Sequence, residues 1–116
     1  MRKEKVAMIA KSVVDFMIPD DVRQQVKSEC PIMVDDLSSW DLPPLGKHTE
    51  GKVLLGIFGF ENNEPIIGLN YRTLNSTKEV RRTTLHEIAH FIRWKSGLNY
   101  GERATCKLAK EWENGK

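Results

Sequence analysis

The stretch TTLHEIAHFI, residues 83–92, contains His86 and His90 four positions apart, with Glu87 directly after the first of them. The chain has only three histidines, and two of them lie here. On an α-helix, residues four apart lie on the same face, so both imidazoles can bind one ion. Zinc favours such nitrogen ligands, and a catalytic zinc usually keeps three protein ligands and one water. The spacing therefore predicts that His86 and His90 bind zinc, one ion per chain.

Glu87 is predicted to be the general base. It lies about 100° around the helix from His86, so its carboxylate can reach the water on the metal without becoming a ligand. The metal lowers the pKa of that water to roughly 7, and the carboxylate takes the proton as the water attacks a carbonyl. This combination is typical of metalloproteases. The alternative is an amphipathic helix that carries the histidines on the flank of its apolar stripe, which consists of Leu85, Ile88, Ala89 and Ile92.

Local sequence sets the ends of the helix that contains this motif. Ser76 and Glu79 have the spacing of a capping box, with Ser76 as the N-cap and Glu79 at the third helical position. Gly97 supplies a C-terminal stop. We therefore predict one helix from Thr77 to about Ser96.

A last helix is predicted from about Glu102 to Glu113, because Ala104, Leu108 and Trp112 recur at four-residue spacing. A chain that reverses direction after Gly97 could bring the first turn of this helix back beside the histidines.

The third zinc ligand is to be sought mainly on this last helix. A metzincin would continue with a glycine and a third histidine, but those positions hold Arg93 and Ser96, which excludes that subclass. Glu102 is our choice, because it falls in line with Cys106 on the inner flank of the last helix. Cys106 is itself an acceptable zinc ligand, and Glu102 could instead only stabilise the helix N-terminus. The remaining candidates are His48, Glu111 and Glu113.

The rest of the chain predicts two helices and three strands. The helices are expected at Lys3–Met17 and Asp20–Glu29, and the strands at Ile32–Leu37, Lys52–Phe60 and Pro65–Leu74. The polar sequence ENNE between the last two strands predicts a hairpin. Residues 38–51, rich in proline, glycine and polar residues, are predicted to be an irregular loop. The strand glycines Gly56, Gly59 and Gly68 predict a bulge or a close approach of another backbone.

Composition limits the class of protein. A chain of 116 residues is long enough for one domain with a modest core. A net charge of +2, from 18 basic and 16 acidic residues, does not indicate a nucleic acid or an anionic membrane as partner. Cys30 and Cys106 are compatible with a pair or with two free thiols. The N-terminus is basic and then apolar, as in a signal peptide, but Lys11 and Asp15 interrupt the apolar run, so we expect no signal peptide. We expect a cytoplasmic protein that is a monomer or a small homo-oligomer.

TLHEIAH followed by GERATCKLAKEW resembles the gluzincins, in which a second helix supplies a glutamate ligand to zinc. At this length the chain most resembles the minigluzincins, and it is also similar to ImmA/IrrE-type peptidases. The resemblance implies an α+β, zincin-like fold: N-terminal helices on a small three-stranded twisted sheet, the HExxH helix, and a C-terminal helix bearing Glu102. It also implies latency, with a terminal segment covering the cleft.

The resemblance further implies that an extended substrate pairs with an edge strand of the sheet. By order along the chain this strand is KVLLGIFGF, so Ile57, Phe58 and Gly59 are the expected substrate-binding residues. Tyr100 is a candidate to donate a hydrogen bond to an oxyanion, or alternatively to pack between the two helices.

The sequence thus predicts a small zinc metalloendopeptidase that hydrolyses peptides or proteins. The alternative is a non-catalytic zinc-binding domain that recognises a partner protein. A peptidase acting on DNA-bound proteins is disfavoured by the nearly balanced charge.

Overall fold

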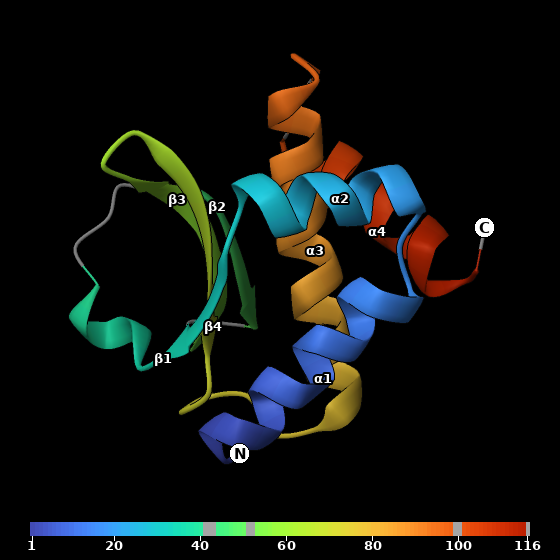
Figure 1. Ribbon diagram of the computed structural model, residues 1–116. Coiled ribbons are helices and arrows are strands. Elements are labelled where there is room, and N and C mark those ends of the chain that lie inside the picture. Colours follow the sequence, from blue (N-terminus) through green and yellow to red (C-terminus); the bar gives the residue numbers. More distant parts are fainter. Residues whose placement is uncertain (41–43, 51–52, 99–100, 116) are drawn as a thin grey trace.

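The computed structural model describes residues 1–40, 44–50, 53–98 and 101–115, and for 44–50 it describes the backbone alone. The fold is α+β, and along the chain the strands lie between two pairs of α-helices (Figure 1). In order, the elements are α1 (Lys3–Phe16), α2 (Asp20–Glu29), β1 (Ile32–Asp35), the short 3-10 helix η1 (Leu37–Ser39), β2 (Pro44–Glu50), β3 (Val53–Glu61), β4 (Glu64–Asn70), α3 (Thr77–Lys95) and α4 (Glu102–Glu113).

The described strands form one mixed sheet in the order β1-β4-β3-β2. Strand β1 runs parallel to β4, and the other neighbours are antiparallel. The sheet therefore has four strands where three were predicted, because β2 lies in the segment expected to be a loop. Its sequence, PLGKHTE, has no regular apolar alternation, and its pairing with β3 has two irregularities in register. Pairing with the apolar β3, rather than local preference, makes this segment a strand.

The predicted hairpin between β3 and β4 is confirmed. Asn62 and Asn63 have φ of 53° and 66°, the left-handed conformation at both central positions of a type I′ turn. At Gly68 of β4 a side chain, and not the predicted second backbone, makes the close approach: a Cβ built there would lie 2.6 Å from the ring of Trp40. The sheet face opposite the helices is thus covered in part by the chain around η1.

Helix α3 lies at the centre of the molecule (Figure 1). It packs against β2, β3 and β4 on one side and against α1 and α4 on the others. The α-helices of the described residues all lie on one side of the sheet (Figure 1). The largest fully buried side chains come from both layers and include Phe58, Ile67 and Leu69 of the sheet and Leu85, Ile88 and Phe91 of α3. The motif helix is therefore surrounded by protein over most of its length.

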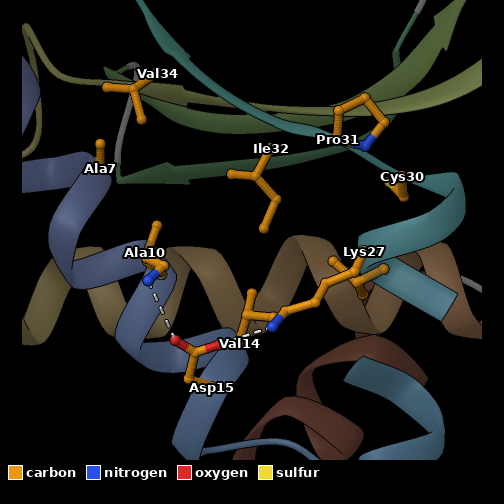
Figure 2. Close-up of a pocket in the computed structure, with 11 residues that line it drawn as sticks. Ala7, Ala10, Val14, Asp15, Lys27, Cys30, Pro31, Ile32 and Val34 are labelled. Carbon is orange, nitrogen blue, oxygen red and sulfur yellow. Dashed lines mark ion pairs between the residues drawn. The ribbon is translucent and has the colours of Figure 1, made fainter. Parts of the chain in front are cut away.

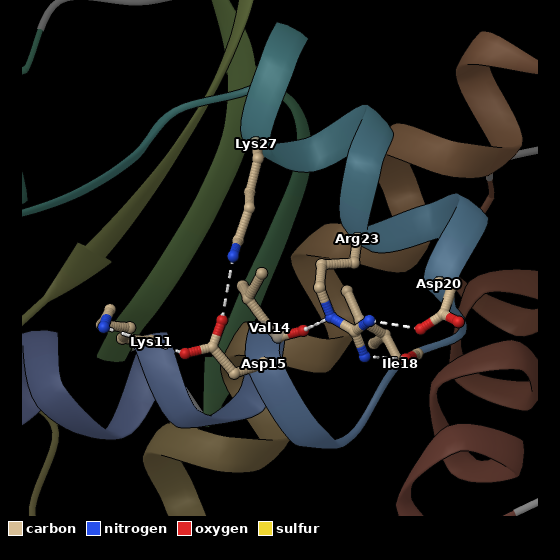
Figure 3. Close-up of polar contacts among 7 residues, drawn as sticks. All are labelled: Lys11, Val14, Asp15, Ile18, Asp20, Arg23 and Lys27. Carbon is tan, nitrogen blue, oxygen red and sulfur yellow. Dashed lines mark hydrogen bonds and ion pairs between the residues drawn. The ribbon is translucent and has the colours of Figure 1, made fainter.

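Polar contacts fasten α2 to α1 (Figure 3). Arg23 donates from Nε to the Val14 carbonyl in the last turn of α1 at 2.8 Å, and from a terminal nitrogen to the Ile18 carbonyl in the connection to α2 at 3.1 Å. Asp15 pairs with Lys27 at 3.1 Å, and this ion pair lowers the pKa of Asp15. These contacts fix the N-terminal helices as one unit beside α3.

Helix α3 begins and ends close to where the sequence predicts. The Ser76 hydroxyl accepts from the Glu79 amide at 3.1 Å, and the Glu79 carboxylate accepts from the Asn75 amide at 2.8 Å. Gly97 has φ of 69°, and the amides of Gly97 and Leu98 donate to Trp94 and Arg93, the bonds of a Schellman motif. Helix α4 then packs principally against α3, burying Thr105, Ala109 and Trp112. No helix of the described residues has the length and apolar character needed to cross a bilayer.

The Ser76 cap gives a direct test of this helix boundary. Ser76→Ala removes the acceptor for the Glu79 amide, and we expect it to lower the free energy of unfolding by about 1 kcal/mol. The matched control is Lys78→Ala, an exposed change in the same turn that removes no cap and should have almost no effect. Chemical denaturation measures both, and equal losses from the two variants would contradict the role of the cap.

Candidate metal centre

The two motif histidines meet inside the protein. His86 and His90 are 3% and 1% exposed, and their Nε2 atoms lie 3.2 Å apart. They are brought together by the helical spacing of four, and their rings meet edge to face with centroids 4.8 Å apart. The ring of Phe58 lies parallel to that of His90, with centroids 6.4 Å apart. Two imidazole nitrogens thus occupy fixed, neighbouring positions.

Glu102 brings a carboxylate to the same point from α4. Its Oε2 lies 3.0 Å from His86 Nε2, and its Oε1 lies 3.0 Å from His90 Nε2. Ligands bound to zinc at about 2.0–2.1 Å in a tetrahedral arrangement are roughly 3.3 Å apart, so the two nitrogens and a carboxylate oxygen have nearly the required separation. The Glu102 side chain is 60% exposed, so the cluster is open to solvent on this side. The expected return of α4 toward the histidines is therefore observed.

In each imidazole, Nε2 faces the other ligands, and the second ring nitrogen, Nδ1, lies near a side chain of α4. We call Nδ1 the outer nitrogen. Thr105 Oγ1 is 3.4 Å from His90 Nδ1, and Cys106 Sγ is 3.7 Å from His86 Nδ1. With a proton on each Nδ1, both Nε2 atoms and the Glu102 oxygens direct lone pairs into one small volume. A cation relieves the repulsion between these lone pairs, and this donor set of two imidazoles and one carboxylate is one that zinc accepts. The residues present therefore fit a zinc ion.

Cys106 lies near the cluster but behind the His86 ring. Its sulfur contacts Nδ1, whereas His86 Nε2 is the atom that meets His90 and Glu102. Burial, and then the nearby Glu102 charge, raise the pKa of the Cys106 thiol. Both cysteines are free. Cys30 is buried away from this cluster, and burial raises its pKa to about 12.

Glu87 is completely buried beside the two histidines. Its carboxylate and one nitrogen of each imidazole all lie within 4.8 Å of one another. The side chain faces the sheet at Gly56 of β3, where a Cβ added to the glycine would be 3.1 Å from Glu87 Oε2. The glycine therefore makes room for the carboxylate, so here too a side chain lies where another backbone was predicted.

The prediction that β3 is an edge strand that binds the substrate is wrong. Strand β3 is not at the edge of the sheet, because Ile57, Phe58 and Gly59 pair with β4 on one side and with β2 on the other. Phe58 is also fully buried and contacts Phe91 and Trp94. These residues therefore cannot pair with an added peptide strand. Tyr100 and the side chain of His48 lie outside the described residues.

Two cavities differ in their relation to the cluster. One, of about 290 Å³, lies between α3 and α4 and is lined by His86 and Cys106 together with Arg82, Leu85, Ala109, Lys110 and Glu113. The other, of about 250 Å³, lies between α1, α2 and β1, with Ala10, Ile32 and Cys30 on its walls and the Asp15–Lys27 ion pair at its side (Figure 2). Only the first reaches a candidate metal ligand.

Thr105 is a functional candidate that the sequence analysis missed. Its position three residues after Glu102 places it on the same face of α4, one residue before Cys106, and this spacing was the available indication. We expect Thr105→Val to lower zinc affinity by about 10–100-fold, because an outer hydrogen bond orients a ligand imidazole. Competition with a chromogenic chelator measures the change. Thr84→Val is the control, since Thr84 is equally buried but bonds to the Val80 carbonyl of its own helix. Equal affinity in both variants would exclude the orienting role.

No protein-family model, no curated protein and no solved structure matches this chain. The arrangement of side chains around His86, His90 and Glu102 is therefore the basis for assigning a function.

Proposed function

We propose that this protein is a small zinc-dependent peptidase. The observation that carries the proposal is the meeting of His86 Nε2, His90 Nε2 and the Glu102 carboxylate at mutual distances of 3.0–3.2 Å, with the Glu87 carboxylate directly beside them. The resemblance to minigluzincins supports the same function, because their zinc ligands correspond to these three residues.

His86, His90 and Glu102 would hold the ion. Three protein ligands are the number typical of a catalytic zinc, whereas a structural zinc usually has four. When bound, zinc supplies Lewis acidity, which polarises a carbonyl group and makes a water molecule more acidic. The exposed side chain of Glu102 supports access to the centre from the side of α4.

Glu87 would act as the proton carrier. Its carboxylate accepts a proton from the attacking water and passes it to the nitrogen of the leaving amine, so that the peptide bond breaks and the carboxylate is regenerated. The rigid helix holds Glu87 next to His86 in sequence and space, which keeps the base beside the reacting atoms. Burial of Glu87 removes competing water from this step.

The substrate would bind as an added strand along β2. This strand is at the edge of the sheet, packs against α3, and has no strand on its outer side among the described residues. Backbone hydrogen bonds from β2 would hold an extended peptide across the motif helix. We therefore assign to β2 the substrate-binding role that the resemblance gave to β3.

A non-catalytic zinc domain is the second candidate. The near-complete burial of His86 and His90 favours it, because a site that mainly stabilises a fold does not need access for a substrate. Under this alternative, loss of zinc lowers the melting temperature, and no change at Glu87 alters a measurable property other than stability.

Metal analysis and a cleavage assay on the same preparation test the proposal. We expect one zinc per chain in protein purified without chelators, and cleavage of casein that stops when a chelator is added and returns with zinc. Limited proteolysis before the assay tests latency, since removal of a covering segment would raise the rate. Protein that binds no zinc refutes both candidates, whereas zinc binding without cleavage in either form supports the second.

A further inference from the structure

The side chains that surround Glu87 form a tight packing contact between α3 and β3. A Cβ built on Gly56 would lie 2.6 Å from Thr83 Cγ2, 3.1 Å from Glu87 Oε2 and 3.3 Å from Glu87 Cγ. The two side chains are one helical turn apart and meet the same point of the sheet. Gly56 cannot move aside easily, because it pairs with Leu69 of β4 and with His48 of β2. The location of the carboxylate therefore depends on the absence of a side chain at position 56.

Thr83 adds a polar group to this contact. It is completely buried, and its Oγ1 has no hydrogen-bond partner among the described residues. A buried hydroxyl without a partner is uncommon, because its desolvation is not compensated. Thr83 lies one turn before Glu87 on α3, and its Cγ2 atom meets the same point at Gly56 as the Glu87 carboxylate. A rotation of about 120° about the Cα–Cβ bond would bring Oγ1 to the position now held by Cγ2, the atom that contacts this point.

We infer that Gly56 and Thr83 are positioning residues for Glu87: the glycine provides the space for its carboxylate, and the threonine hydroxyl donates a hydrogen bond to it during the reaction. This inference rests on the proposed function. It concerns where the base is held, and it leaves the zinc ligands untouched. A displacement of a catalytic group by a fraction of an ångström reduces the rate without preventing substrate binding.

Gly56→Ala tests the space for the carboxylate. We expect kcat to fall about 10-fold or more, while KM and zinc affinity stay within about 2-fold of the wild-type values. In the metal-free protein, the side-chain carboxyl ¹³C resonance of Glu87, assigned by its loss in Glu87→Gln, should shift. The resonance reports the surroundings of Glu87 without any assay of activity.

A control substitution at a second glycine distinguishes displacement of Glu87 from a general effect of overpacking. Gly68→Ala introduces an equally close contact, 2.6 Å from Trp40, at the other face of the sheet. We expect Gly56→Ala and Gly68→Ala to lower Tm by similar amounts, whereas Gly68→Ala should leave the Glu87 resonance and kcat unchanged. An equal loss of kcat in both glycine variants would overturn the inference, because overpacking alone would then explain it.

Thr83 variants complete the test. Thr83→Val keeps the shape and removes the hydroxyl, and we expect kcat to fall about 10-fold with zinc affinity retained. Gly56→Ala combined with Thr83→Ser keeps the hydroxyl and removes the Cγ2 contact, so Tm should recover in part while kcat stays low. Full recovery of kcat in the double variant, or full activity of Thr83→Val, would overturn the inference. Loss of zinc-dependent cleavage from the wild type itself would instead refute the proposed function.

Discussion

Glu87→Gln should lower kcat for peptide cleavage by about 10²–10⁴-fold, the contribution typical of a general base. The amide has the size and shape of the carboxylate but cannot accept the proton of the attacking water. Zinc content should remain at one ion per chain, because the cluster of His86, His90 and Glu102 is unchanged. Steady-state kinetics on a quenched fluorescent peptide, together with metal analysis of the same sample, measure both quantities.

The control is Glu111→Gln, an exposed change on α4 that removes the same charge. It should leave kcat, KM and zinc content unchanged. Full cleavage by Glu87→Gln protein would eliminate Glu87 as the base. A wild type that never cleaves, with the variant differing in stability alone, would favour the non-catalytic zinc domain.

Glu102→Ala should weaken zinc binding by more than about 100-fold. It removes the carboxylate that lies 3.0 Å from both Nε2 atoms, and with it the negative charge that offsets the charge of the ion. Cys106→Ser should reduce affinity by about 10-fold at most, because its sulfur meets the outer nitrogen of His86. Competition titration against a chelator of known affinity measures both variants.

These two variants also decide between the ligand sets left open by the sequence. If Cys106→Ser loses more affinity than Glu102→Ala, the set that includes sulfur is correct, and the tight cluster around Glu102 is only a hydrogen-bonded pair of histidines and a carboxylate. Peptide cleavage should decrease in parallel with zinc occupancy in Glu102→Ala and recover in part at high zinc concentration. If Glu102→Ala protein stays inactive when zinc fully occupies its site, Glu102 has a role other than binding the metal.

Local sequence was sufficient for α3 because this helix carries its own boundaries. Ser76, Glu79 and Gly97 form caps whose bonds involve only neighbouring residues, so the ends of α3 could be predicted closely. The position of Glu102 followed from helical spacing and from the reversal at Gly97. The binding of zinc and the hydrolysis of peptides remain predictions.

Long-range contacts account for what could not be predicted. Strand β2 forms because β3 offers it a partner, and its own residues carry no alternation that indicates a strand. Without β2, β3 would be an edge strand, and this explains the wrong assignment of Ile57, Phe58 and Gly59. Similarly, the role of Gly56 depends on which helix faces it, since spacing along the chain does not reveal the partner of a glycine.

If zinc binds as proposed, the docking of α4 on α3 would make the stability of this last helix depend on the supply of zinc. Helix α4 has few buried side chains of its own, and Glu102 is the residue through which an ion would join it to α3. Free zinc at 100 times its dissociation constant would add about 2.7 kcal/mol to the stability of the native state, and this contribution disappears when zinc is scarce. Under starvation the last helix should undock first, exchange its amide hydrogens rapidly and become accessible to other proteases. The abundance of this protein in a cell would then follow the concentration of available zinc.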